Sequence, residues 1–362
     1  MKKLFVLICM LSMGSLAWAQ TAPSLGSAAS FSALAGGPAA GAVTCTTSTI
    51  TGDVGVVAPG TFFNTGCTIS GAINPNATGP YADFLNAYGL LPGANPVCTQ
   101  TLTTLDGQVL SPGVYCVAAA ATSTGSLLTL NGPSNGIWIF RIGTSGTGAL
   151  TGTSFSVVMA GGGVPCNVYW WVAQAATMTD SNFVGTILAG ADITVTRGTF
   201  IGRALAGGKG TTAIPSGAVT LTDTILGGCG SSPAPATGTI KVTGGGQIQV
   251  PDPSSLGTAS FGFNAGTGKD GSGGHFNYVN HVTGLHVDGP VNQIVVIAFN
   301  SDGSPKTVLF SGTCGDSCAF SVIVQDNGEP GINDQFGVTV TGAVTEFRSL
   351  RVISNGNIQF HK

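Results

Sequence analysis

Several segments of the chain repeat one alternation of polar and apolar positions. It occurs at residues 177–179, 194–196 and 220–222. Each segment has threonine at its first and third places and a single apolar residue between them. Successive side chains of a β-strand point to opposite faces. The alternation therefore predicts short strands with a Thr-x-Thr outer face and an apolar inner face.

A longer pattern, Thr-x-x-(Thr/Ser/Asn)-(Ile/Phe), extends this register to earlier segments. It occurs at residues 46–50, 65–69, 151–155, 179–183 and 196–200. The spacing is 17 residues from Thr179 to Thr196 and 19 from Thr46 to Thr65, which is about one coil of a solenoid. We therefore predict a β-solenoid with Ile and Phe stacked inside and threonine ladders outside. The high β-propensity of threonine is the alternative explanation, but it does not account for recurrence at fixed places.

One segment of the same domain has a helical pattern instead. Between Pro80 and Pro92 the apolar residues recur at spacings of three and four, which is typical of a helix with one buried face. We predict one long α-helix over residues 81–91. Its buried stripe would be Tyr81, Phe84, Leu85 and Tyr88.

A stretch rich in Gly, Ser, Pro and Ala at residues 227–238 separates this domain from a second one. The predicted organisation is a signal peptide at 1–19, a β-solenoid at 20–227, a linker at 228–238 and an accessory domain at 239–362. Alternating apolar positions predict that the accessory domain is also all-β. The expected fold class is therefore mainly β with one helix.

Charge is scarce along the whole chain. Charged residues make up 7% of it, and the formal net charge is −3. Residues 21–234 contain six Asp, no Glu and four Lys or Arg, and all four His come later. Enzymes that use carboxylates or imidazoles, and proteins that bind nucleic acid, need many more such groups. We expect no enzyme activity, no cofactor and no nucleic-acid partner.

The second domain holds two groups of residues of the kinds that bind metals. These are His275, His281 and His286, and separately Asp326, Asn327, Glu329 and Asp334. Neither group has the spacing of a defined site, and the acidic run lacks the Asp-x-Asp-x-Asp-Gly pattern of an EF-hand. We expect no metal here and interpret the acidic run as a turn with solvated carboxylates.

The first residues have the features of a secretory signal peptide. Lys2 and Lys3 precede an apolar run at residues 4–16, and the Ala17-Trp18-Ala19 pattern follows it. An uncleaved membrane anchor is the alternative, but the run is shorter than the roughly 18 residues that a span needs. We expect a secreted, extracellular protein that is cleaved near Ala19 and has no membrane span.

Eight cysteines follow the expected cleavage site. An even number in an oxidising compartment indicates disulfides, although many connectivities are open. If each cysteine pairs with its neighbour in the sequence, an assumption that rests on proximity alone, the disulfides are Cys45–Cys67, Cys98–Cys116, Cys166–Cys229 and Cys314–Cys318. A redox or metal site is the alternative for the last pair, but its spacing is not C-x-x-C.

Several motifs, in order along the chain, carry a family resemblance. They stand at residues 25–26, 31–37, 51–55, 112–115, 166–172, 183–189, 202–206 and 218–221. Together they resemble the secreted microbial ice-binding proteins of the DUF3494 family, over about residues 24–226. The second domain is similar to a small accessory domain of secreted bacterial proteins, sometimes called post-COAP, which brings no activity with it.

The resemblance implies a discontinuous right-handed β-solenoid of triangular section with the helix along one side. It also implies a secreted bacterial antifreeze protein that adsorbs to ice through a flat face of T-A/G-x-T/N motifs. The expected face consists of Thr46, Thr49, Thr65, Thr68, Thr151, Ser154, Thr177, Thr179, Asn182, Thr194, Thr196, Thr199, Thr220 and Thr222. Asp180 and Arg197 occupy second places of the motif, where they would disturb ordered water if they pointed onto the face.

Two other classes of protein are alternatives to an ice-binding protein. A cell-surface adhesin or matrix protein would use the solenoid as a stalk. A polysaccharide lyase or hydrolase is disfavoured, since the first domain has few carboxylates and basic groups. The expected partner is the surface of an ice crystal. Attachment to the cell envelope and self-association through the second domain are left open.

Overall fold

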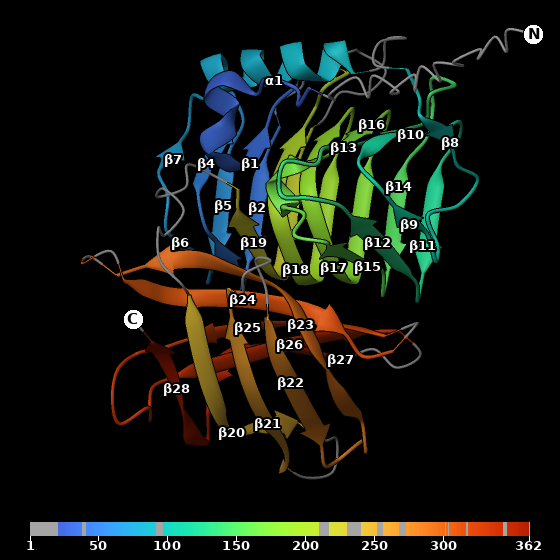
Figure 1. Cartoon of the computed structure of the whole chain (residues 1–362). Coiled ribbons are helices and arrows are strands. Elements are labelled where there is room, and N and C mark those ends of the chain that lie inside the picture. Colours follow the sequence, from blue (N-terminus) through green and yellow to red (C-terminus); the bar gives the residue numbers. More distant parts are fainter. Residues whose placement is uncertain are drawn as a thin grey trace, which may run out of the picture.

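The computed structural model describes residues 21–37, 41–91, 97–209, 217–229, 240–251, 256–267, 273–300, 302, 304–315, 318–342 and 346–361. The expected signal peptide and almost all of the expected linker lie outside these ranges. The described chain forms two bodies, a parallel β-solenoid and an antiparallel β-domain, which lie one above the other in Figure 1.

The solenoid contains nineteen strands within the described ranges, and its neighbouring strands pair in parallel. They are β1 (Phe31–Ala35), β2 (Val43–Thr46), β3 (Thr49–Ile50), β4 (Asp53–Val56), β5 (Phe62–Thr65), β6 (Thr68–Ile69), β7 (Ile73–Asn74), β8 (Gln100–Thr101), β9 (Val109–Leu110), β10 (Gly113–Val117), β11 (Ala121–Thr124), β12 (Leu127–Asn131), β13 (Trp138–Ile142), β14 (Leu150–Thr153), β15 (Ser156–Ala160), β16 (Val168–Val172), β17 (Ala176–Ala189), β18 (Ile193–Ala206) and β19 (Val219–Gly228). The mainly β class expected from the alternations is confirmed.

The strands form three faces of a triangular solenoid. The helix face has the order β8-β10-β13-β16-β17-β18-β1-β4-β7. The threonine face has the order β11-β14-β17-β18-β19-β2-β5. The covered face has the order β9-β12-β15-β17-β18-β19-β3-β6. The long strands β17 and β18 bend at two corners and so contribute to all three faces.

The order of the coils in space differs from their order in the chain. Strand β19 ends the solenoid segment, yet it pairs with β18 on one side and with β2 on the other. The register continues across this junction, with Thr196 beside Thr222 and Thr222 beside Thr46. The N-terminal coils therefore stack on the last coils of the solenoid and not on β8.

Apolar side chains fill the interior of the solenoid, as the repeat predicts. Phe155, Phe183 and Phe200 are fully buried and form a continuous aromatic column. Phe140 and Trp170 stack with their ring centroids 3.9 Å apart. Because such interiors are as densely packed as organic crystals, the coils form a rigid support for the side chains outside.

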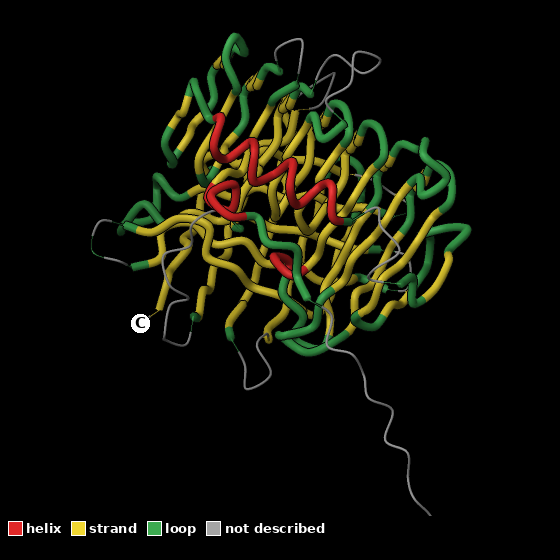
Figure 2. Tube along the Cα trace, turned by 90° about the horizontal axis from the view of Figure 1, so that it is seen from above, coloured by secondary structure: helices red, strands yellow, loops and turns green. Residues whose placement is uncertain are grey.

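The predicted helix is present, and it starts three residues earlier than expected. Helix α1 (Thr78–Leu90) lies along the helix face, as Figure 2 shows from above. Phe84, Ala87 and Tyr88 are buried in one apolar cluster with strand residues such as Leu34 and Leu205. This apolar contact, stabilised by roughly 25 cal/mol per Å² of buried area, is what holds the helix on the solenoid.

A carboxylate also ties α1 to the 3-10 helix η1 (Gly26–Ser30). Asp83 accepts hydrogen bonds from the Ser27 backbone nitrogen at 2.7 Å and from Ser27 Oγ at 2.6 Å. These bonds hold the pKa of Asp83 below its usual value.

We expect Asp83→Asn to lower the melting temperature slightly near pH 7 and to have no effect in strong acid. A carboxyl whose pKa is lower in the folded state stabilises the fold above its unfolded pKa of about 3.9. That contribution disappears as the pH falls through the folded pKa. Thermal unfolding of both proteins at neutral and strongly acidic pH tests this. An equal difference at both pH values would contradict it.

The structure contains four disulfides, and they are the neighbouring pairs proposed from proximity. Cys45–Cys67 joins β2 to the corner after β5, and Cys98–Cys116 closes a loop onto β10. Cys166–Cys229 ties η2 (Pro165–Asn167) to the residue that follows β19. Cys314–Cys318 spans the turn after β24. Both sulfur atoms of this last pair are bonded to each other, so no free thiolate is present there to bind a metal.

The second body is an antiparallel meander of nine strands in the described ranges, with the order β27-β26-β25-β24-β23-β22-β21-β20-β28. Its strands are β20 (Lys241–Pro251), β21 (Leu256–Gly266), β22 (Gly273–Asn280), β23 (His286–Phe299), β24 (Pro305–Thr313), β25 (Ala319–Gln325), β26 (Gln335–Thr341), β27 (Glu346–Val352) and β28 (Asn355–His361). Aromatic rings form its core, for example Phe261 stacked on Phe336 with centroids 3.9 Å apart.

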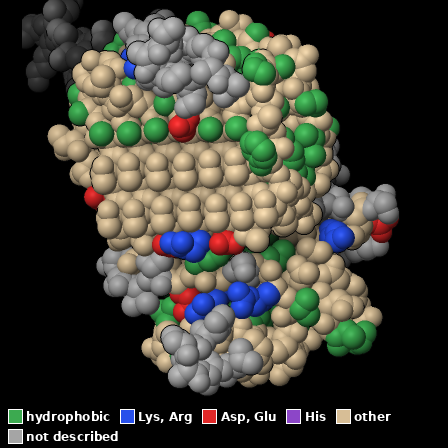
Figure 3. Space-filling view, turned by 180° about the vertical axis from the view of Figure 1, so that it is seen from behind, with side chains coloured by type: hydrophobic (Ala, Val, Ile, Leu, Met, Phe, Trp, Pro, Cys, Tyr) green, Lys and Arg blue, Asp and Glu red, His purple; other side chains and the backbone are tan. Residues whose placement is uncertain are grey.

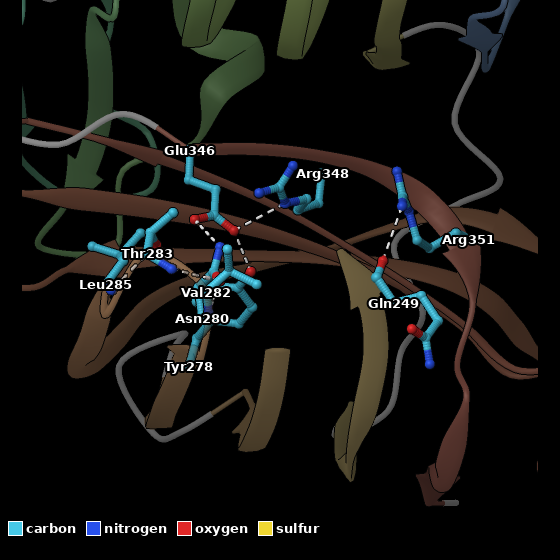
Figure 4. A network of polar contacts seen from close by, with 9 residues as sticks. All are labelled: Gln249, Tyr278, Asn280, Val282, Thr283, Leu285, Glu346, Arg348 and Arg351. Atoms are coloured by element: carbon cyan, nitrogen blue, oxygen red, sulfur yellow. Dashed lines mark hydrogen bonds and ion pairs between the residues drawn. The ribbon is translucent and has the colours of Figure 1, made fainter. Parts of the chain in front are cut away.

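A buried polar network closes this core beside β27 (Figure 4). Glu346 accepts hydrogen bonds from Tyr278 Oη, from Asn280 Nδ2 at 2.8 Å and from Arg348 Nε at 3.0 Å. Burial, together with the bond to Glu346, raises the pKa of Tyr278. The carboxylate is satisfied by these three donors, so the network is structural.

The outer side of the β24–β26 sheet packs on the covered face of the solenoid. Leu309 and Ile323 belong to the same apolar cluster as the solenoid residues Val184 and Ile201. Polar bonds join the two bodies nearby. They run from Asn182 Nδ2 to Thr339 O at 3.5 Å, from Thr199 Oγ1 to Ser321 Oγ at 3.2 Å, and between the hydroxyls of Ser156 and Thr341. The second domain thus shares part of its hydrophobic core with the solenoid.

The acidic run considered for calcium lies between β25 and β26, and it binds the chain's own backbone. Asp334 accepts the backbone N–H of Asn327 at 2.9 Å and that of Ile358 at 2.8 Å. Asp326 accepts the N–H groups of Gly328 and Phe360. Asp334 is buried, which raises its pKa. These carboxylates fix the loop against β28, so they are less solvated than the sequence suggested.

Candidate functional site

The threonine face carries two straight files of side chains. Each of its seven strands points two residues outward, and the register aligns them across the strands. The first file is Thr122, Thr151, Thr177, Thr194, Thr220, Thr44 and Phe63, and the second is Thr124, Thr153, Thr179, Thr196, Thr222, Thr46 and Thr65. Figure 3 shows these files as two parallel rows on a flat surface. Phe63 is the one position of either file that is not threonine.

The backbone and the core fix the spacing of this array. Neighbouring strands lie about 4.8 Å apart, and alternate residues of one strand about 6.7 Å apart. The residues between the files point inward and are buried, as Met178, Val195 and Leu221 show. Threonine is branched at Cβ and has few χ1 rotamers. The face is therefore a regular lattice of methyl and hydroxyl groups with little freedom to move.

A left-handed residue follows the second file on every coil and turns the chain at the corner. The φ angles are 47° at Thr47, 50° at Ser154, 51° at Asp180, 50° at Arg197, 49° at Asp223, 75° at Gly66 and 58° at Gly125. Only glycine adopts this conformation without strain, and other residues lose roughly 1 kcal/mol or more. The second place of the repeated motif is therefore a corner and not part of a flat strand.

The charged residues of the motif occupy these corners. Arg197 donates from Nε to Asp180 Oδ1 at 2.7 Å and from Nη2 to Asp180 Oδ2 at 2.9 Å. Asp223 accepts a hydrogen bond from Thr47 Oγ1 on the next coil. The bonds to Asp180 raise the pKa of Arg197. Figure 3 shows charged side chains along one border of the two files. Asp180 and Arg197 thus border the array and leave its surface uncharged.

Nine of the fourteen residues predicted for the flat face lie on the threonine face. They are Thr46, Thr65, Thr151, Thr177, Thr179, Thr194, Thr196, Thr220 and Thr222. Four further threonines of the array were missed, namely Thr44, Thr122, Thr124 and Thr153. Thr44 and Thr153 each form a Thr-x-Thr alternation with a predicted residue, Thr46 and Thr151. The same sequence pattern could therefore have identified these two residues. The register of the 151–155 motif was two residues off, because Thr153, not Thr151, aligns with Thr179.

The other five predicted residues lie elsewhere, which corrects the expectation of a single face. Thr49, Thr68, Asn182 and Thr199 are on the covered face, and Ser154 is at a corner. The left-handed second place explains the difference, since it turns the chain between the first and fourth places of each motif. Asn182 and Thr199 are only 5% and 3% exposed beneath the second domain.

The covered face has a different chemistry from the threonine face. Val184, Ile201 and Ile225 point outward there, are buried, and share an apolar cluster with Leu309 and Ile323 of the second domain. An apolar stripe of this kind favours a protein partner over ordered water. The middle of this face is accordingly a domain interface.

The remaining candidate residues do not assemble into a site. All four histidines are exposed and lie on the second domain; His275 Nε2, for example, is 2.9 Å from Asp288 Oδ1. Among the residues that the structure describes, no group of three or more His, Cys, Asp or Glu side chains is arranged to hold a metal ion. No helix in the described ranges is long and apolar enough to cross a membrane.

Comparisons with known proteins point to one kind of protein. The profile of a family described as ice-binding-like matches residues 29–226. An ice-binding protein of Nostoc sp. (strain HG1) is 34% identical over 194 residues, which are 52% of this chain and 64% of that protein, so the match spans less than two thirds of the relative.

Two crystal structures resemble part of the chain. The ice-binding protein from an Antarctic biological consortium is 28% identical, with a TM-score of 0.50 over 57% of this chain and 91% of that one. The ice-binding protein of the Antarctic ascomycete Antarctomyces psychrotrophicus is 27% identical, with a TM-score of 0.48 over 57% of this chain and 98% of that one.

Proposed function

Because the chain belongs to the ice-binding-like family over residues 29–226, we propose that it adsorbs to ice through the threonine face. The observation that carries this proposal is the array of thirteen threonines in two aligned files. The array is flat, rigid and uncharged. A face of this kind matches a crystal lattice better than it matches a flexible ligand.

The threonine side chain suits this task for two reasons. Its methyl group orders neighbouring water, and its hydroxyl both donates and accepts hydrogen bonds. Repeated on a regular grid, these groups hold water in positions that a growing crystal can continue. Each contact is weak, but a rigid array engages many at once, so their sum makes adsorption effectively irreversible.

Adsorption alone would account for the activity, without turnover chemistry. Adsorbed molecules pin the ice front, which bulges between them, and the curvature lowers the local freezing point. We infer a protein that limits ice growth and recrystallisation. The charged row beside the second file, which includes Asp180, Arg197 and Asp223, would hold ordinary hydration water and so mark one edge of the contact.

We also infer that the protein works outside the cell. The basic and apolar N-terminal pattern and the four disulfides support this, since disulfides persist in oxidising compartments. The second domain is then available to solvent on the side away from the solenoid, where the envelope or another copy could meet it.

The direct test uses the full-length protein and a single ice crystal. Fluorescently labelled protein should become incorporated into a growing ice hemisphere, and unlabelled protein should produce a measurable gap between melting and freezing temperatures. Exclusion from the hemisphere together with the absence of a gap would sink the proposal. The family assignment would stand in either case.

We expect Phe63→Thr to strengthen adsorption to ice by a factor of at most about two. Phe63 is 55% exposed at the end of the first file, and its ring is larger than the threonine side chains beside it. Threonine would complete the file on β5. Ile73→Thr is the matched control, since Ile73 is also exposed on the end coil but belongs to the helix face. Equal effects of the two substitutions on thermal hysteresis would argue against the threonine face.

A further inference from the structure

A cavity of about 410 Å³ opens in the second domain where β24, the loop before β26 and β28 meet. Its size is within the range of small-molecule sites, roughly 300–1,000 Å³. Polar side chains of different kinds line it, and so does one aromatic residue. The residues that matter here are Asn300, Lys306, Asp326, Phe360 and His361.

The acceptors of this cavity are held in place and keep unused capacity. Asp326 accepts the N–H of Gly328 at 2.8 Å and that of Phe360 at 3.2 Å, one on each carboxylate oxygen. Each oxygen has a second lone pair available. Asn300 donates from Nδ2 to Ser304 Oγ at 3.0 Å, which fixes the orientation of its amide. Its Oδ1 has no bonded partner among the described residues.

The two donors differ in how firmly they are held. His361 Nε2 lies 2.7 Å from Thr243 Oγ1, so the ring is oriented while its second nitrogen stays available. Lys306 forms no ion pair within the described part of the chain, and its ammonium group carries three donors. Groups that are already positioned lose little freedom when a ligand binds.

This combination suits a ring that is rich in hydroxyl groups. A sugar hydroxyl donates one hydrogen bond and accepts others, so it needs acceptors and donors side by side. The C–H face of the ring is apolar and packs well on an aromatic side chain such as Phe360. A multiply charged anion fits less well, because the carboxylate of Asp326 shares the cavity with Lys306.

We propose that this cavity binds one pyranose ring of a polysaccharide. Asp326 and Asn300 accept from its hydroxyls, Lys306 and His361 donate to them, and Phe360 packs on its apolar face. The site gives the second domain a ligand of its own. It does not depend on the threonine face, which belongs to the other body of the molecule.

Affinity electrophoresis of the full-length protein tests this, in native gels that contain dextran, glycol chitin or alginate. These probes present neutral, N-acetylated and uronate pyranoses. We expect retardation in at least one gel. Lys306→Met should weaken it about tenfold, a change of about 1.4 kcal/mol in binding free energy, because it removes a charged hydrogen-bond donor. His361→Gln should weaken it in the same direction.

Two variants serve as controls. Lys209→Met removes the same charge from the solenoid, where Lys209 Nζ donates to Gly146 O at 2.8 Å. Its mobility with polysaccharide, relative to its own mobility in a gel without polysaccharide, should match that of the parent. Thr196→Tyr, on the threonine face, should also keep full retardation. The proposal is overturned if no gel retards the parent, or if Lys306→Met is retarded as strongly as the parent while its melting temperature is unchanged.

Discussion

Replacing Thr196 with tyrosine should remove most of the thermal hysteresis, a loss of roughly tenfold or more. Thr196 lies on β18, the fourth of the seven strands of the threonine face, between Thr179 and Thr222. A phenol ring at this point would stand above the plane and hold the neighbouring threonines away from the crystal. Many weak contacts act together only while the geometry lets them engage at once, so one obstacle at the centre breaks most of them. Hysteresis at equal protein concentration measures the effect.

Thr68→Tyr is the control for this experiment, because it makes the same chemical change on another face of the solenoid. Thr68 lies on β6, at the end of the covered face, and is exposed to solvent. The sequence placed Thr68 and Thr196 on one surface, whereas the structure separates them by a corner. Full activity of Thr68→Tyr and loss with Thr196→Tyr would support the threonine face. Loss of activity with Thr68→Tyr and full activity of Thr196→Tyr would indicate that another face of the solenoid contacts ice.

Ile323→Asp is expected to destabilise the protein by roughly 3–5 kcal/mol, the effect of an unpaired buried charge. Ile323 lies on β25, is 2% exposed and belongs to the apolar cluster that joins the two bodies. A carboxylate there would enter the apolar cluster that contains Val184 and Ile201. We expect a lower melting temperature and more exposed apolar surface, measured by calorimetry and by dye binding.

Ile332→Asp controls for the added charge. Ile332 belongs to the same domain but is 69% exposed, so its substitution should change stability by no more than about 0.5 kcal/mol. Similar losses for the two variants would show that the contact between the bodies contributes little. The same reasoning predicts that the solenoid prepared without the second domain exposes its apolar stripe, so activity assays are best made on the full chain.

The sequence was sufficient for the features that depend on local periodicity. A Thr-x-Thr alternation is a property of one strand, and burial of the residue between the threonines follows from it directly. Residues such as Thr177, Thr194 and Thr220 could therefore be placed on the outer surface with no knowledge of their neighbours. The helix was equally predictable, because its apolar stripe and the flanking prolines are local sequence features.

The corners could not be located in this way. A left-handed conformation is recognisable from sequence where glycine occupies it, as at Gly66, but Thr47 and Arg197 have no such mark. Without the corner, the first and fourth places of the motif appear to share a strand. That is why Thr49 and Thr199 were assigned to the same surface as Thr46 and Thr196.

The contact between the two domains also could not be predicted from local sequence patterns. Asn182 and Thr199 are polar, which favours exposure, and nothing near them in sequence indicates that β25 and β26 will cover them. Their burial depends on residues more than a hundred positions later. The outward-facing Val184 and Ile201 were the available hint, since they are apolar where the equivalent side chains of the threonine face are hydroxylated.

The insertion of β19 between β18 and β2 has a consequence for how the protein is made. On the helix face β1 pairs directly with β18, but on the threonine face β2 has its neighbour only after β19 has been synthesised. Contacts this distant in sequence slow folding, since a long loop must close before they form. A nascent chain that ends before residue 219 would leave a gap in the middle of the threonine array and not a shorter array. The continuous lattice is thus completed late, by a single strand.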